Sequence, residues 1–144
     1  MIAIDTSALI ALLRREDEAE PVARVLAEAE RCFLSAVGLL EASMVMIGRG
    51  PPELVNLLDA LLQELAIEIV PFDEGLARES REAFIRFGKG RHSAGLNFGD
   101  CVSYALAQTR GLPLLYKGDG FAKTDVIGVL QGPTADARAT GGRK

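Results

Sequence analysis

The sequence contains no tryptophan, one histidine and two cysteines among its 144 residues. A single histidine excludes a zinc site built on two imidazoles, and it leaves His92 as the one candidate base for a serine or cysteine nucleophile. Cys32 and Cys101 lie in apolar segments without the spacing of metal ligands. We interpret both as small buried side chains of a protein from a reducing compartment.

Long apolar runs, a basic leader and a phosphate-binding glycine loop are absent as well. No apolar stretch reaches the roughly 20 residues that cross a bilayer, and no basic segment precedes the apolar N-terminus as it does in a signal peptide. The segment Gly88-Lys89-Gly90 is too short to form a P-loop. We therefore expect a cytoplasmic protein that does not enter a membrane.

Negative charge predominates overall but not everywhere. The formal net charge of −4 argues against attraction of the whole molecule to nucleic acid. Residues 83–99, however, contain no acidic side chain. The side chains of this segment that can carry positive charge are Arg86, Lys89, Arg91 and His92. This basic segment predicts local binding of an anion.

The order of apolar segments predicts the fold class. The length fits one domain with a substantial core. Strands are expected at residues 2–4, 32–34, 67–70, 113–116 and 126–130, and helices at 7–13, 17–30, 36–47, 51–66, 74–87 and 98–109. This alternation predicts an α/β fold with a short parallel sheet of four to five strands flanked by helices. We expect residues 1–130 to form the domain and residues 131–144 a flexible tail.

Asp5 directly follows the first expected strand, and Thr6 and Ser7 open the next helix. A carboxylate at this point stands at the carboxyl end of a parallel strand, where open α/β sheets bind ligands. Asp5 can also cap the helix. The two roles are compatible, because one oxygen can accept a backbone N–H while the other meets a metal ion.

Three further acids occupy positions that need an explanation. Glu41 lies in an apolar helical arc, where its charge requires either an arginine or a metal ion nearby. Asp100 lies in the first turn of a helix, where the helix dipole favours a carboxylate with or without a ligand. Asp119 follows the fourth strand in a Gly-Asp-Gly turn, which is also ordinary turn chemistry.

The joint placement of these acids favours a metal site. Carboxyl ends of parallel strands and the starts of the following helices meet at one rim of the sheet, so Asp5, Asp100 and Asp119 are expected there together. Clustered carboxylates need a compensating charge, which the hard cation Mg²⁺ supplies. Such a site suits hydrolysis of phosphate esters, and the basic segment before Asp100 could hold the flanking phosphates.

Several motifs follow one another in a specific order. They are Ile4-Asp5-Thr6-Ser7-Ala8-Leu9, the helical Glu41, Gly88-Lys89-Gly90-Arg91-His92 leading to Leu96-Asn97-Phe98-Gly99-Asp100-Cys101, and Leu114-Leu115-Tyr116-Lys117-Gly118-Asp119 with Thr124-Asp125. From residue 1 to about 130 the chain resembles the PIN-domain ribonucleases, and more narrowly the VapC toxins of bacterial type II toxin–antitoxin systems.

The resemblance implies a three-layer PIN-like fold and an endoribonuclease that depends on Mg²⁺ or Mn²⁺. Such an enzyme hydrolyses RNA phosphodiester bonds with metal-activated water, forms a homodimer and is neutralised by a VapB-like antitoxin. It implies catalytic roles for Asp5, Glu41, Asp100 and Asp119, metal ligation by Asp5 and Asp100, support of the acid site by Thr6, Ser7 and Asp125, and RNA contacts from Arg86, Lys89, Arg91 and His92. Relatives often carry two adjacent aspartates where this chain has Asp119-Gly120, so the choice between Asp119 and Asp125 as fourth acid stays open.

Two other classes of function compete with a toxin. One is a PIN nuclease that processes RNA without arresting growth. The other is a non-catalytic regulatory domain that binds a cation. A response-regulator receiver would carry a pair of acids after the first strand, but Asp5 is followed by Thr6. A haloacid-dehalogenase phosphatase would carry an aspartate where Ser7 stands. The leucine-rich helix from Leu54 to Leu65 and the early helices offer a candidate surface for an antitoxin or, equally, for dimerisation.

Overall fold

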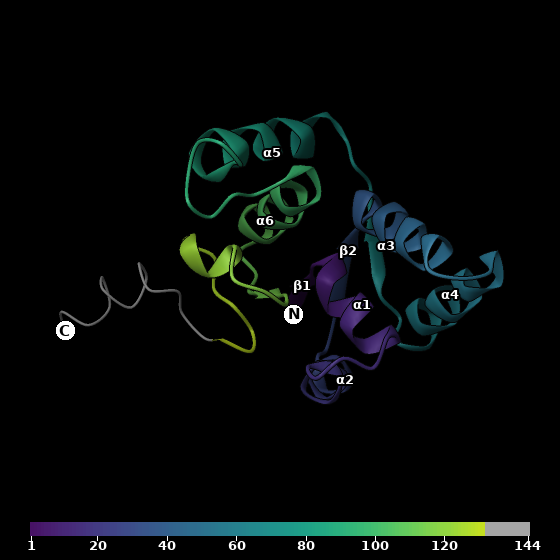
Figure 1. Ribbon diagram of the computed structural model, residues 1–144. Coiled ribbons are helices and arrows are strands. Elements are labelled where there is room, and N and C mark those ends of the chain that lie inside the picture. Colours follow the sequence, from purple (N-terminus) through teal and green to yellow (C-terminus); the bar gives the residue numbers. More distant parts are fainter. Residues whose placement is uncertain (132–144) are drawn as a thin grey trace.

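The computed structural model describes residues 1–131 and contains one parallel sheet with strand order β3-β2-β1-β4. Its strands are β1 (Ile2–Ile4), β2 (Cys32–Ser35), β3 (Glu68–Val70) and β4 (Leu114–Leu115). β1 pairs with β2 on one side and β4 on the other, so its carboxyl end lies in the middle of the sheet rim (Figure 1). The sheet confirms the predicted α/β class.

Six α-helices accompany the sheet in the described part of the chain. They are α1 (Thr6–Leu13), α2 (Ala19–Glu28), α3 (Ala36–Gly48), α4 (Val55–Glu64), α5 (Glu74–Phe87) and α6 (Phe98–Arg110), with short 3₁₀ turns at Pro52–Leu54 and Phe121–Lys123. Three of these helices begin at a side-chain cap, because Ser35, Asp73 and Asn97 each accept a backbone N–H from the first turn of the following helix. Side-chain caps satisfy amides that lack a partner within the helix, which is why these helices begin there.

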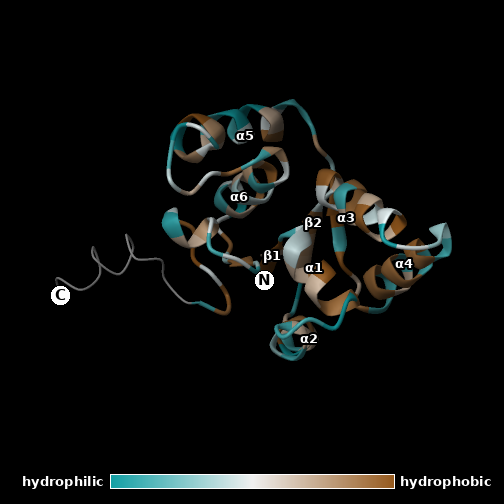
Figure 2. Ribbon diagram, viewed as in Figure 1, coloured by the Kyte–Doolittle hydropathy of each residue, from teal (hydrophilic) through white to brown (hydrophobic). Residues whose placement is uncertain are grey.

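The helices form one layer on each face of the sheet. Successive strand residues point to opposite faces, and Ala3 and Phe33 pack with α5 and α6, whereas Ile4 and Leu34 pack with α1 to α4. Figure 1 shows α5 and α6 on one side of β1 and β2, and α1, α3 and α4 on the other. In Figure 2, α1, α3 and α4 are largely hydrophobic, whereas α5 mixes hydrophilic and hydrophobic residues. The predicted three-layer arrangement is confirmed.

One expectation about the last part of the chain is wrong, and a second is not tested by the described residues. Residues 126–130 form no strand, because they make only an isolated parallel bridge from Gly128 to Leu114. The predicted tail lies, apart from Gln131, outside the described residues. Within residues 1–131, no helix has the length and apolar character needed to cross a membrane.

Several large apolar side chains of the helices lie at the surface. Phe98 is 69% exposed, since it is the first residue of α6 and precedes the buried stretch that starts at Cys101. Leu40 and Met44 of α3 are 61% and 63% exposed. The leucine-rich helix α4, in contrast, buries Leu58 and Leu62 against the core. The larger apolar surface is therefore the one around Phe98.

Candidate active site

Asp5 ends β1 with one carboxylate oxygen engaged and the other free. The side chain is only 4% exposed. Its Oδ2 accepts the backbone N–H of Ser7 at 3.0 Å and so caps α1. Its Oδ1 is buried and has no hydrogen-bond partner among the described residues. A buried carboxylate oxygen without a partner is costly, so this oxygen is a ready ligand for a cation.

Three acids from three separate elements line one pocket of about 290 Å³. Asp5 comes from the end of β1, Glu41 from the middle of α3, and Asp100 from the first turn of α6. Their charges act on one another, since Asp5 raises the pKa of Glu41, and both raise the pKa of Asp100. The structure thus brings together three of the four acids that the sequence singled out.

Glu41 is held close to the start of α6. A Cβ placed on Gly99 would overlap the carboxylate of Glu41, so any other residue at this position would require the Glu41 side chain to move. Burial raises the pKa of Glu41, the Thr6 hydroxyl partly offsets this, and the charge of Asp5 adds to it. Within residues 1–131 no lysine or arginine forms an ion pair with Glu41. The alternative of an arginine salt bridge is therefore wrong for the described part of the chain.

Asp100 combines a capping role with a perturbed carboxylate. Asn97 and Asp100 form a reciprocal capping box, in which each side chain accepts the other's backbone N–H at 3.0–3.1 Å. Burial raises the pKa of Asp100 to about 6, and the charges of Asp5 and Glu41 raise it while the Asn97 backbone bond lowers it. A shift of this kind marks a carboxylate that gains from a nearby cation.

Thr6 and Ser7 fix the walls of the pocket. The Thr6 hydroxyl donates to the carbonyl of Gly38 in α3 at 3.1 Å. The Ser7 hydroxyl accepts the backbone N–H of Lys117, just beyond β4, at 3.0 Å. The two hydroxyls therefore join the start of α1 to the helix that carries Glu41 and to the neighbouring strand. These two bonds position the elements that carry the acids, and the Thr6 hydroxyl also acts on the Glu41 carboxylate.

The arrangement fits a divalent cation that keeps part of its water shell. Within residues 1–131, no three Asp, Glu, His or Cys side chains converge tightly enough to enclose a metal ion by themselves. Mg²⁺ usually retains several waters and takes only one or two carboxylates from the protein. The unpartnered oxygen of Asp5 and the carboxylate of Asp100 supply such a pair.

The remaining predicted acids do not line this pocket. Asp119 is exposed in the turn after β4. Asp125 accepts a short hydrogen bond from the hydroxyl of Tyr104 and pairs with Arg86 at 3.3 Å. Asp125 thus joins α6 and α5 at a distance from the acid pocket, and the identity of a fourth site acid stays a prediction.

The basic segment is likewise placed away from the pocket lining. Arg86 stacks on the ring of Phe87, and Arg91 donates to the carbonyl of Ile85 at 3.1 Å. The ring nitrogen Nδ1 of His92 accepts the backbone N–H of Ala94, and Lys89 is exposed. None of the four basic residues of this segment lines the pocket that holds Asp5. Their contact with RNA stays a prediction.

Charged residues that sequence reasoning missed occupy the other end of the pocket. Arg14, Glu16, Arg49 and Lys117 all line it. Lys117 donates to Glu16 at 2.7 Å, and Arg14 pairs with the same carboxylate at 2.9 Å. These residues lie far apart in the sequence, in the turn after α1, after α3 and after β4, and no local pattern links them.

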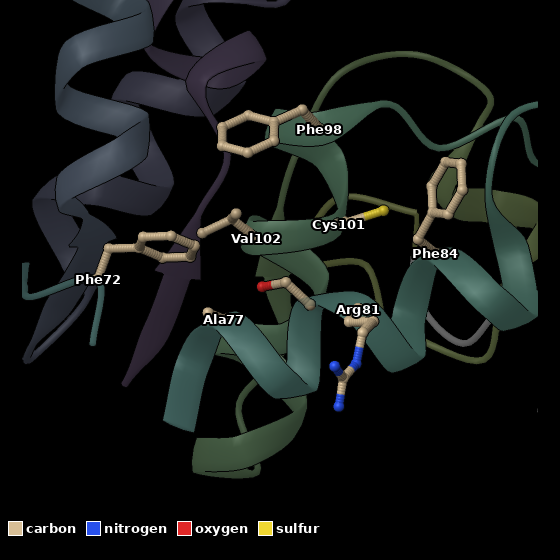
Figure 3. Close-up of a pocket in the computed structure, with 8 residues that line it drawn as sticks. Phe72, Ala77, Arg81, Phe84, Phe98, Cys101 and Val102 are labelled. Atoms are coloured by element: carbon tan, nitrogen blue, oxygen red, sulfur yellow. The ribbon is translucent and has the colours of Figure 1, made fainter. Parts of the chain in front are cut away.

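An apolar surface adjoins the acid pocket at Glu41. Glu41, Leu40, Met44 and Phe98 share a hollow of about 390 Å³. On its other side Phe98 borders a second hollow of about 440 Å³ between α5 and α6, lined among others by Phe72 and by the residues labelled in Figure 3. Figure 3 shows the rings gathered around this hollow and the guanidinium of Arg81 directed away from them. We call the exposed apolar side chains that line the two hollows the Phe98 face; they are Leu40, Met44, Phe72, Phe84 and Phe98.

Comparison with known proteins agrees with this architecture. Residues 2–127 match the PIN domain family. A VapC ribonuclease of Mycobacterium bovis is 47% identical over 124 residues, which cover 85% of this chain and 93% of that protein. A ribonuclease VapC of Mycolicibacterium smegmatis is 43% identical over 126 residues, which cover 88% of this chain and 98% of that protein.

Solved structures share the fold at lower identity. VapC20 of Mycobacterium tuberculosis, described as a sarcin–ricin loop cleaving toxin, has a TM-score of 0.75 at 17% identity and covers 90% of this chain and 98% of its own. VapBC2 of Rickettsia felis, bound to promoter DNA, has a TM-score of 0.64 at 17% identity, and the match covers 84% of this chain and 90% of that chain. Together with the matched sequences, they confirm the resemblance seen in the motifs: the chain belongs to the PIN domain family and, within it, to the VapC ribonucleases.

Proposed function

We propose that this protein is an endoribonuclease of the VapC type that depends on a divalent cation, Mg²⁺ or Mn²⁺. The observation that carries the proposal is the meeting of Asp5, Glu41 and Asp100 in one pocket, with an unpartnered buried oxygen on Asp5. When bound, the cation supplies positive charge beside the scissile phosphate and an activated water. The names of the relatives, VapC ribonucleases, support the same substrate class.

The residues of the acid pocket have different proposed roles. Asp5 and Asp100 would hold the cation, because they carry the free oxygen and the carboxylate with the raised pKa. Glu41 lies beside them with a raised pKa and no ion-pair partner within residues 1–131, which suits a group that exchanges a proton with water. Thr6 and Ser7 keep these elements in register through their bonds to Gly38 and Lys117.

The first test is cleavage of total bacterial RNA with the sites mapped at nucleotide resolution. Wild-type protein should cleave in Mg²⁺ or Mn²⁺ and should stop when EDTA removes the cation. Asp5→Asn and Asp100→Asn should each lose about 100-fold or more in rate, or about 3 kcal/mol of barrier. Asp59→Asn, an exposed aspartate on α4, is the matched control and should cleave as wild type does. Full cleavage by both site variants would contradict the proposal.

We further propose that a VapB-like antitoxin controls the nuclease. Solved structures with this fold include a toxin–antitoxin complex from Klebsiella pneumoniae and VapBC2 of Rickettsia felis. Induced expression of the chain alone should arrest growth of a host, and co-expression with the product of a neighbouring small gene should restore it. Normal growth without that partner, combined with RNA cleavage in vitro, would favour an RNA-processing nuclease.

We also propose that a second copy of the chain covers the Phe98 face. This face exposes large apolar side chains on α3, α5 and α6, and contiguous exposed apolar patches mark protein interfaces. It borders Glu41, so a homodimer formed there would place a partner against the edge of each acid pocket.

A further inference from the structure

The acid pocket has an acidic end and a cationic end. At the acidic end, the charge of Asp5 raises the pKa of Glu41, and the charges of Asp5 and Glu41 raise the pKa of Asp100. At the other end, Lys117, Arg14 and Arg49 all lower the pKa of Glu16. Within residues 1–131, Lys117 and Arg14 form their ion pairs with Glu16 and Glu18, and no cation forms an ion pair with Asp5, Glu41 or Asp100. The charged residues that line the hollow therefore divide into an acidic group and a cationic group.

The three cations differ in how far they are already neutralised. Lys117 is held between Glu16 at 2.7 Å and Glu18 at 3.4 Å, and its backbone is tied to Ser7. Arg14 shares the same Glu16 carboxylate at 2.9 Å. Arg49 is exposed at the end of α3 and, within residues 1–131, makes no ion pair. Arg49 is therefore the lining cation with its donors available to an incoming anion.

We propose that Arg49, assisted by Arg14, binds a backbone phosphate of the RNA next to the scissile one. The inference rests on the proposed function, since it takes the acidic end as the site of cleavage. A guanidinium presents two parallel N–H donors to a phosphate, a match that a lysine lacks. A strand with its scissile phosphate at the acids would reach the cationic end with an adjacent phosphate, so the pocket would hold the RNA along the line from the acids to Arg49.

The test measures RNA binding without cleavage. Asp5→Asn serves as the background, and a fluorescein-labelled single-stranded RNA of mixed sequence is titrated in Mg²⁺ at several salt concentrations. Adding Arg49→Gln should weaken binding about tenfold at 0.1 M salt. The slope of the logarithm of the binding constant against the logarithm of salt concentration should also fall in magnitude by roughly 0.7, the value for one phosphate contact on a single strand. The RNA affinity of the Arg49→Lys protein should lie between that of the Asp5→Asn background and that of the Arg49→Gln protein. Melting temperatures should not change, because only the backbone of Arg49 takes part in the end of α3.

The matched control is Lys123→Gln, which removes an equally exposed positive charge outside the pocket lining. It should leave binding within about twofold of the background. Equal weakening by both substitutions, or none by Arg49→Gln, would overturn the inference and leave the proposed nuclease intact. Cleavage of the labelled RNA by the Asp5→Asn background would instead contradict the proposed function, whatever Arg49 does.

Discussion

At the scale of single residues, Gly99 has the clearest mechanistic consequence. Its missing side chain leaves the space that the Glu41 carboxylate occupies, with both oxygens within 2.7 Å of where a Cβ would stand. Gly99→Ala should push Glu41 out of position and lower kcat/KM for RNA cleavage by about 10- to 100-fold, as misplacement of a reacting group by an ångström does. Cleavage assays on total RNA measure this.

The control for Gly99→Ala is Gly48→Ala at the end of α3. A Cβ on Gly48 meets nothing within 4 Å, so the helix accepts alanine without a clash. This variant should cleave as wild type does. Both variants should show cooperative melting close to that of wild type. If Gly99→Ala cleaves normally, Glu41 has no positional role in the reaction.

Protonation of Asp100 gives a second prediction at this scale. Its pKa is raised to about 6, above the unfolded value of 3.8, so the folded metal-free state binds more protons than the unfolded state between these values. Stability from this group is therefore lost as pH rises through about 6. Asp100→Asn should raise the stability of the EDTA-treated protein at pH 8 by about 1 kcal/mol, or roughly 3–5 °C in Tm.

Near pH 4 the same substitution should have little effect, because Asp100 is then largely protonated in the folded protein. Melting curves of wild type and Asp100→Asn in EDTA between pH 4 and pH 8 test whether the substitution stabilises the protein only at the higher pH. Affinity for Mn²⁺, measured by calorimetry on wild type, should fall about tenfold from pH 7 to pH 5 as protons compete for a carboxylate of this pKa. A stabilisation by Asp100→Asn that is the same at both pH values would contradict this account.

At the scale of elements, α5, α6 and the turn after Phe121–Lys123 are joined by one polar cluster. The Tyr104 hydroxyl donates to Asp125, and Arg86 and Gln108 both donate to that hydroxyl at 3.3 Å. Burial raises the pKa of Tyr104 to about 12, and Asp125 contributes in the same direction. The cluster holds three segments together on the face of the sheet opposite α1.

Tyr104→Phe should destabilise the protein by about 1–2 kcal/mol, because it leaves half-buried polar partners without the hydroxyl they share. Chemical denaturation measures the loss. RNA cleavage at a temperature well below Tm should be unchanged, since none of these residues lines the acid pocket. A specific loss of kcat with stability retained would show that Asp125 acts on the acid site after all.

At the scale of the whole molecule, the Phe98 face predicts how the chain associates. Phe98→Ser should convert a homodimer to a monomer in sedimentation equilibrium without lowering Tm by more than a few degrees, because Phe98 is largely exposed. Leu57→Ser on α4, where the leucine is 55% exposed, is the control and should leave the dimer intact. Dissociation by Leu57→Ser alone would move the interface to α4, and a monomeric wild type would leave the Phe98 face to an antitoxin.

The fold was predictable because its signals are local. Apolar alternation located the strands and helices, and Ser35, Asp73 and Asn97 marked helix starts within three residues of the amides they cap. The capping role of Asp5 was predictable, since the residue directly follows a strand and precedes a helix, whereas its role as a metal ligand stays a prediction.

The site was predictable only in part, because pairings across long separations leave no local trace. Nothing near Arg86 indicates that its partner is Asp125, 39 residues later. The cationic end of the pocket consists of Arg14, Arg49 and Lys117. These residues lie in three separate turns, which only the tertiary structure brings together. The surface position of Phe98 could not be predicted for another reason. Helical spacing identifies the apolar stripe of a helix, but it does not show where along that stripe a neighbouring element stops covering it.

The central position of β1 has a consequence for the order of events during synthesis. The first strand made carries Asp5, but the strand that pairs on its open side is β4, and Lys117 beyond it provides the amide that Ser7 accepts. A nascent chain that has emerged only through α5 holds Asp5 and Glu41 and lacks Asp100. Each growing polypeptide thus lacks Asp100, the proposed partner of Asp5 in cation binding, until the ribosome has passed α5, which would delay activity until after α6 has been made.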